Sequence, residues 1–161
     1  MDLSRLRRSE IVGALAGVVL ILSLGLQWFT LTGGPERMQQ NAYVCGQGDL
    51  TCSGFETFPI LRWLLILAAL APMILAYLIV TEAELSWPAG ELTTIVGFTA
   101  ITLIGYNGIV DKPGNALQEF GVSLSYGYWI AMLAAVMLTV AGGIRTVESG
   151  GGAPHKPPGT F

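Results

Sequence analysis

Charged residues are scarce in this chain of 161 residues, and they are absent from the centres of its long apolar runs. Asp, Glu, Lys and Arg together make up 12% of the sequence, against roughly 25% in ordinary soluble domains. The residues AVILMFWYC make up 52%. A soluble domain this short leaves too much surface exposed to hide so many apolar side chains from water. The composition therefore predicts that most of the chain lies in a lipid bilayer.

The chain has a single histidine, and this scarcity speaks against nucleophilic catalysis and against a metal site. The single histidine, His155, lies near the C-terminus. Neither Ser23 nor the threonines of the apolar runs have a histidine or lysine base nearby in the sequence, so nucleophilic catalysis has no support. The net charge of −3 with scattered basic residues also speaks against nucleic-acid binding. We expect no enzyme activity, no cofactor and no metal site.

Four apolar runs have the length that crosses a bilayer, for which roughly 20 residues are needed. They cover residues 11–31, 60–80, 92–110 and 124–144. The first run is too long for a secretory signal and no small-residue cleavage site follows it, so we interpret it as a retained span. The sequence predicts an all-α membrane protein, a four-transmembrane-helix bundle over residues 1–146. The Gly- and Pro-rich residues 147–161 are predicted to form a disordered tail.

The basic residues predict how the spans are oriented. Arg5, Arg7 and Arg8 precede the first span, and Arg145 and Lys156 follow the fourth. Basic residues beside spans favour the cytoplasmic side. Since four spans place both ends on one side, we expect a multi-pass protein of the plasma membrane with both termini in the cytoplasm.

The only two cysteines lie in the predicted first outer loop, residues 32–59. In an oxidising compartment, Cys45 and Cys52 are typical of a disulfide that staples the loop. A zinc site would need four ligands, and a thiol oxidoreductase usually carries a C-x-x-C pair, which is absent here. The disulfide is the favoured interpretation, with a redox role as the alternative.

Small residues recur at helical spacing in two of the spans, where they allow helices to approach closely in lipid. Gly13 and Gly17 form such a pair in the first span, and Gly127, Ala131 and Ala135 continue one in the fourth. We interpret them as packing positions within one chain. A contact between two copies is the alternative.

Polar residues at membrane depth define two further candidates. Thr99, Thr102 and Tyr106 share one face of the third span. They either line a polar path or simply bond to their own helix and anchor at the interface. Arg62 and Asp111 lie near the predicted outer ends of the second and third spans, which makes an ion pair between them a reasonable hypothesis.

Several short motifs resemble a group of small four-span membrane proteins from actinobacteria. They are RRSE before the first span, QWF at its end, YNGIVDKPG after the third span and YGYW at the start of the fourth. The resemblance implies the four-helix membrane fold but no particular activity. The chain departs from that pattern at Gln27, Tyr43, Asn107 and Lys112, and it adds the cysteine pair. A looser likeness to claudin-type proteins concerns the architecture alone.

The sequence as a whole favours a non-enzymatic accessory or scaffold subunit of a larger membrane assembly. The expected partners are the lipid bilayer and either other membrane subunits or further copies of the chain. A small oligomeric channel or transporter that uses the polar face of the third span is the alternative.

Overall fold

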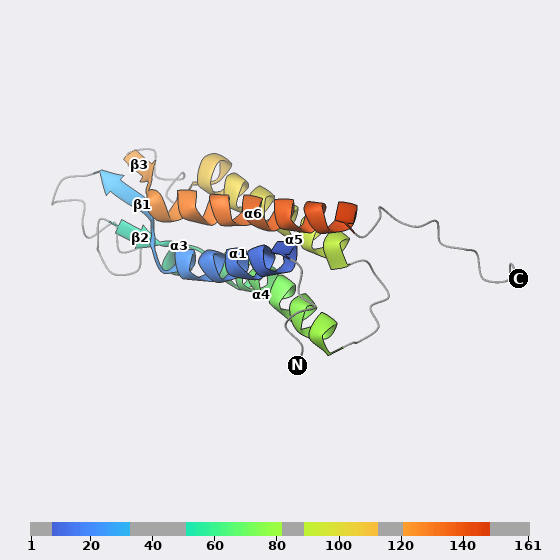
Figure 1. Cartoon of the computed structure of the whole chain (residues 1–161). Coiled ribbons are helices and arrows are strands. Elements are labelled where there is room, and N and C mark those ends of the chain that lie inside the picture. The colour runs from blue at the N-terminus through green and yellow to red at the C-terminus, as the bar shows by residue number, and fades with distance from the viewer. Residues whose placement is uncertain (1–7, 33–50, 82–88, 113–120, 149–161) are drawn as a thin grey trace, which may run out of the picture.

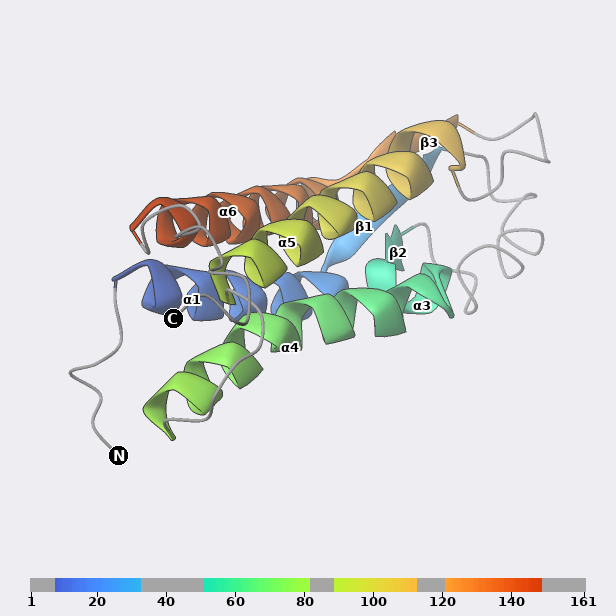
Figure 2. The same cartoon turned by 90° about the vertical axis from the view of Figure 1, so that its right-hand side faces the viewer.

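The computed structural model describes residues 8–32, 51–81, 89–112 and 121–148. The elements in chain order are α1 (Arg8–Leu24), β1 (Gln27–Thr32), β2 (Thr51–Ser53), α3 (Gly54–Thr57), α4 (Leu61–Val80), α5 (Ala89–Gly105), the π-helical turn η3 (Tyr106–Val110), β3 (Gly121–Leu124) and α6 (Tyr126–Glu148). Four long helices lie side by side, and the three strands gather at one end of them (Figures 1 and 2).

The four long helices alternate in direction along the chain, so that α1 and α5 run opposite to α4 and α6 (Figure 2). Helix α6 packs against α1 and α5, and α1 also packs against α4, whereas contacts between α4 and α5 are sparser. Leu20, Leu65 and Leu138 are completely buried at the centre of this arrangement. The bundle is thus closed along three helix pairs and loosely closed along the fourth.

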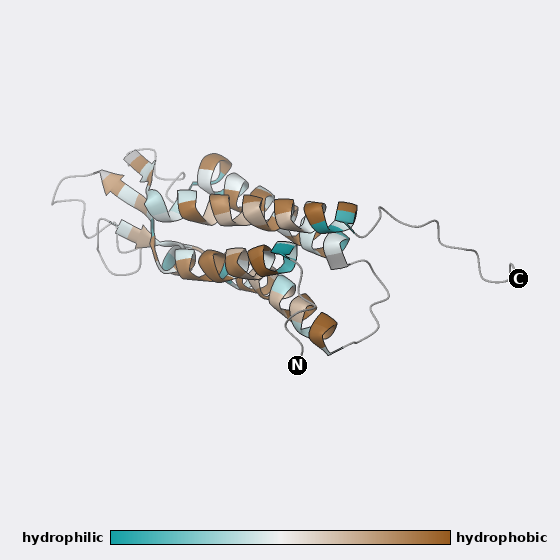
Figure 3. Ribbon diagram, in the orientation of Figure 1, coloured by the Kyte–Doolittle hydropathy of each residue, from teal (hydrophilic) through white to brown (hydrophobic). Residues whose placement is uncertain are grey.

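The outer surface of the bundle is apolar too, as the brown ribbon colour on all four helices shows (Figure 3). Leu67 on α4 and Leu133 on α6 are 64% and 63% exposed, and many other large apolar side chains also point outward. Helices that are apolar all round are typical of membrane spans. Three helices of the described residues are long and apolar enough to cross a membrane: Leu61–Val80, Gly90–Val110 and Tyr126–Glu148.

The predicted bounds of the second, third and fourth apolar runs agree with α4, with α5 plus η3, and with α6 to within a few residues. The first does not. The predicted span 11–31 is wrong at its C-terminal end, because α1 stops at Leu24 and the chain then turns through Gly25 into β1. Helix α1 has 17 residues, which corresponds to about 25 Å at 1.5 Å per residue.

The all-α prediction needs the same correction, because the chain forms a three-stranded antiparallel sheet with the order β2-β1-β3. In the register, Phe29 of β1 lies opposite Cys52 of β2 on one side and Leu124 of β3 on the other. The physical reason is pairing with strands from distant parts of the chain. Gln27–Thr32 can pair with a strand on each side, which satisfies its backbone groups as fully as a helix would.

Trp28 is the centre of the sheet end of the molecule. Its side chain is 1% exposed, and its indole N–H donates to the Ser23 carbonyl at 2.7 Å, in the last turn of α1. The ring packs edge-on against Phe58 and Tyr128, with centroids 6.3 and 5.9 Å away. Trp28 therefore fixes the sheet to the ends of α1 and α6.

Candidate functional site

A polar cluster lies at the end of the bundle away from the sheet, and one of several grooves on the bundle surface runs along the α4/α5 pair. The polar cluster lies where the first turn of α1 meets the last turns of α6. The groove lies farther along the helices, on the side where the bundle is loosely closed.

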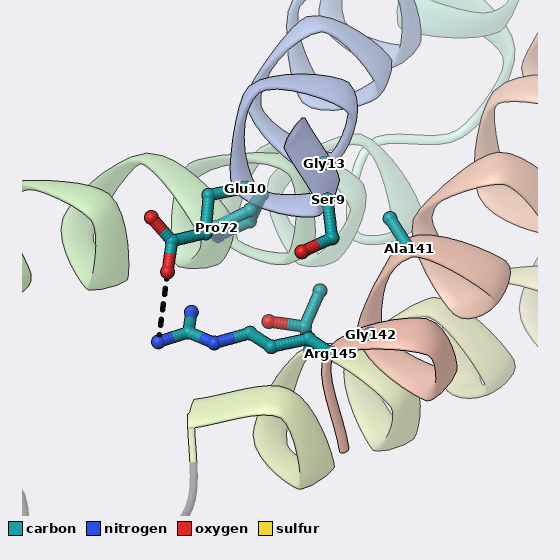
Figure 4. Close-up of a pocket in the computed structure, with 8 residues that line it drawn as sticks. Ser9, Glu10, Gly13, Pro72, Ala141, Gly142 and Arg145 are labelled. Atoms are coloured by element: carbon teal, nitrogen blue, oxygen red, sulfur yellow. Dashed lines mark ion pairs between the residues drawn. The ribbon is translucent and has the colours of Figure 1, made fainter. Parts of the chain in front are cut away.

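The polar cluster is built around an ion pair between α1 and α6. Glu10 Oε1 and Arg145 Nη2 are 3.1 Å apart, and their side chains are 4% and 15% exposed. Beside them, the Ser9 hydroxyl donates to Glu148 Oε2 at 3.3 Å. Figure 4 shows the Glu10 carboxylate and the Arg145 guanidinium pointing toward each other. These contacts place the start of α1 and the end of α6 at the same end of the bundle.

The space inside this cluster is too small for an organic ligand. Its lining residues are Ser9, Glu10, Gly13, Pro72, Thr93, Ala141, Gly142 and Arg145, and the cavity measures about 10 Å³. A volume of that size holds about one water molecule. The cluster is therefore a set of polar contacts that hold α1 and α6 together, and not a binding site for a substrate.

The apolar groove is larger and opens sideways, toward the surroundings of the bundle. It measures about 250 Å³, and its lining residues are Leu64, Leu67, Ala68, Val96, Thr99, Ala100 and Leu103. The Thr99 hydroxyl, the one polar side-chain group among them, donates to the Ile95 carbonyl of its own helix at 2.8 Å. The groove thus offers an apolar surface without titratable groups, which suits an apolar partner and not acid–base chemistry.

The predicted polar path lies on the outside of the described bundle. Thr99, Thr102 and Tyr106 are all exposed, and the Thr102 hydroxyl donates to the Phe98 carbonyl at 3.0 Å. The bundle interior next to them is filled by Ala100 and Ile104, both completely buried. A path along this face would therefore need a second copy of the chain to enclose it.

The predicted ion pair between Arg62 and Asp111 does not appear among the described residues. Arg62 instead donates from Nη1 to the Phe55 carbonyl at 3.1 Å. Its guanidinium carbon lies 4.5 Å from the centroid of the Phe55 ring and 5.6 Å from that of Trp63. Arg62 is held by aromatic rings where the sequence had led us to expect a carboxylate.

The predicted packing residues lie at contacts between elements. Gly13 lies between Pro72 of α4 and Ala141 of α6, and a Cβ at Gly17 would collide with the Ala69 carbonyl oxygen. Gly127 packs against the backbone of Gln27, next to the sheet. Ala131 and Ala135 are completely buried in α6.

Cys52 is completely buried in β2 and is disulfide-bonded, so it is not a free thiol. Cys45 lies outside the described residues. The pairing of the two cysteines therefore stays a prediction. Within the described ranges, no group of three or more His, Cys, Asp or Glu side chains is placed to hold a metal ion.

Sequence reasoning missed the Glu10–Arg145 ion pair and the register of α5 against α6. Arg145 was counted only as a charge flanking the fourth span, and Glu10 was not considered, although each lies about one turn inside a helix end. No protein-family model, curated protein or solved structure matches this chain.

Proposed function

We propose that this chain is an integral membrane protein of four spans, with both termini in the cytoplasm, that works as a non-enzymatic accessory or scaffold subunit of a larger membrane assembly. The groove between α4 and α5 is the observation that carries the proposal. The surrounding apolar surface supports the membrane location.

The closed helix pairs show what a completed helix contact in this chain looks like. Lipid provides no hydrophobic drive for helices to associate, so small residues that permit close approach supply much of the contact. Gly13 and Gly17 do so between α1 and α4, and Gly97 does so between α5 and α6. Ala68 and Ala100 line the α4/α5 groove, yet the contacts between these two helices are sparser than those of the other three pairs.

A helix of another membrane subunit is the occupant that this groove fits. Side chains of a neighbouring helix would fill a shallow apolar trough lined by leucines, alanines and a valine, with Thr99 already satisfied by its own helix. Filling it would give α4 and α5 the contact that the other helix pairs already have. A second copy of the same chain would bring Thr99 and Thr102 of both copies together, as the alternative channel or transporter requires.

A matched pair of substitutions tests the proposal. Leu67 lines the groove and Leu133 lies on the outward face of α6, and their exposures are nearly equal. Tagged wild-type chain, Leu67→Trp and Leu133→Trp are each purified from the native cell in a mild detergent, and the mass and composition of the complex are measured.

We expect the wild-type chain and Leu133→Trp to elute in an assembly of fixed stoichiometry, and Leu67→Trp to elute alone, because the indole occupies the groove. An assembly that survives Leu67→Trp would contradict the proposal. A complex made only of this chain would replace it with the oligomeric alternative.

A further inference from the structure

Arg62 is a cation without a matching anion in the part of the chain that the structure describes. No described carboxylate pairs with it, and its Nε is buried without a hydrogen-bond partner. Its side chain donates a hydrogen bond from Nη1 to the Phe55 carbonyl. One N–H group on Nη1 and the two on Nη2 are therefore open to an acceptor from outside the chain.

Arg145 differs from Arg62, because it has a carboxylate partner within the bundle. That side chain is paired with Glu10 across a helix contact and is shielded from the surroundings. Arg62 has the opposite environment, because its guanidinium lies against two aromatic rings that are themselves partly exposed: Phe55 at 40% and Trp63 at 56%. The two rings meet edge-on with centroids 6.5 Å apart, so the guanidinium carbon lies close to both of them.

The position of this group matches the depth of lipid headgroups. Arg62 lies in the first turn of α4, a helix long and apolar enough to span a membrane. Beside it, Ile60 is 76% exposed. Tryptophan is favoured at the membrane–water interface, and the planar guanidinium fork matches the oxygens of a phosphate. Because both leaflets carry phosphates at this depth, the match holds whichever way the chain is oriented.

We propose that Arg62, Phe55 and Trp63 form a binding site for one membrane phospholipid. The Nη2 donors of Arg62 bind the phosphate, and the exposed faces of Ile60 and Trp63 contact the start of the acyl chains. The apolar neighbours favour a lipid phosphate over free inorganic phosphate, which would gain nothing from them. Lipid binding here is independent of what occupies the α4/α5 groove.

Native mass spectrometry of the full chain in detergent tests this site. Delipidated protein is titrated with phosphatidylglycerol, with diacylglycerol, which lacks the phosphate, and with inorganic phosphate. We expect one phosphatidylglycerol per chain to bind more tightly than the rest, with no comparable binding of the other two probes. Tight binding of inorganic phosphate alone would assign the site to a free anion and overturn the proposal.

Substitutions then locate the bound lipid. We expect Arg62→Gln to weaken phosphatidylglycerol binding about tenfold, in line with the loss of a charge-assisted hydrogen bond, and Arg62→Lys to weaken it less, because the charge remains and the fork is lost. Arg8→Gln, which removes an exposed cation at the other end of the bundle, is the matched control.

If Arg62→Gln does not fold, Trp63→Leu serves instead, because it keeps the Arg62 cation and removes one of the two aromatic rings beside it. We expect a severalfold loss of phosphatidylglycerol binding. Unchanged affinity in the folded Arg62 or Trp63 variants overturns the assignment, and so does an equal loss in Arg8→Gln.

Discussion

At the residue scale, the contact between α5 and α6 depends on glycines that face threonines. Gly90 lies against Thr146, Thr94 against Gly142, and Gly97 against Thr139. From one pair to the next, the residue number rises along α5 and falls along α6 by the same amount, as an antiparallel helix pair requires. Each of the three threonines also donates its hydroxyl to a carbonyl four residues earlier in its own helix. The threonine side chains therefore occupy the space beside the glycines, and their hydroxyl groups already have a hydrogen-bond acceptor.

We predict that Gly97→Ala destabilises the protein by about 1–3 kcal/mol, the usual effect of overpacking a close contact. An added Cβ would lie 2.6 Å from both the backbone nitrogen and the hydroxyl oxygen of Thr139, and the backbone of α6 cannot move aside cheaply. Gly143→Ala is the control, because nothing lies within 4 Å of its Cβ position, and alanine favours the helix. Thermal unfolding in detergent measures both. Equal midpoints for the two variants would show that the contact is not tight.

The sequence predicted which residues pack but not what they pack against. The spacing of Gly13 and Gly17, or of Ala131 and Ala135, defines one face of a helix. It carries no information about which other helix covers that face. The close approach of Gly17 to the Ala69 carbonyl arises from the crossing of α1 over α4 beside Pro72, and that crossing depends on the whole bundle.

At the element scale, the largest disagreement between sequence and structure is the change from helix to strand after Leu24. The run QWFTLT carries no charge and follows the apolar helix directly, so the apolar run extends through residue 31. The strands that pair with β1 have only three and four residues. Such short segments are too short to show the alternation of polar and apolar residues that predicts a strand. Their pairing comes from tertiary contacts around Trp28, Phe29 and Phe58, which local sequence does not encode.

The predicted disulfide between Cys45 and Cys52, a residue of β2, gives a prediction at the scale of the element. If Cys52 is joined to Cys45, protein purified without reductant and then denatured has no thiol that reacts with a maleimide label, whereas both cysteines label after reduction. We expect the double variant Cys45→Ala, Cys52→Ala to lose about 2–3 kcal/mol of stability, as the entropy of closing a short loop implies. Labelling of unreduced protein would refute the intramolecular disulfide.

At the scale of the whole molecule, the polar cluster at the end away from the sheet joins the first and last helices of the bundle. The Glu10–Arg145 ion pair and the Ser9–Glu148 hydrogen bond hold the first turn of α1 beside the last turns of α6. An even number of crossings follows if α1 spans the bilayer together with the three longer helices. At about 25 Å, α1 alone falls short of the ~30 Å hydrocarbon core. The residues after Leu24, with Trp28 buried in the sheet, would have to lie at the interface.

The crossing number decides the last prediction, because four spans put both termini on one side and three put them on opposite sides. We expect a reporter that is active only in the cytoplasm to work when fused to either terminus, and to fail when inserted after Lys112, which follows η3, the turn that packs against the start of α6. A reporter that is active only outside the cytoplasm should give the reverse pattern. The basic residues before α1 favour this result, since they hold that end on the cytoplasmic side. Termini that report from opposite sides would show that α1 does not cross, and they would also contradict the contacts that hold the start of α1 beside the end of α6.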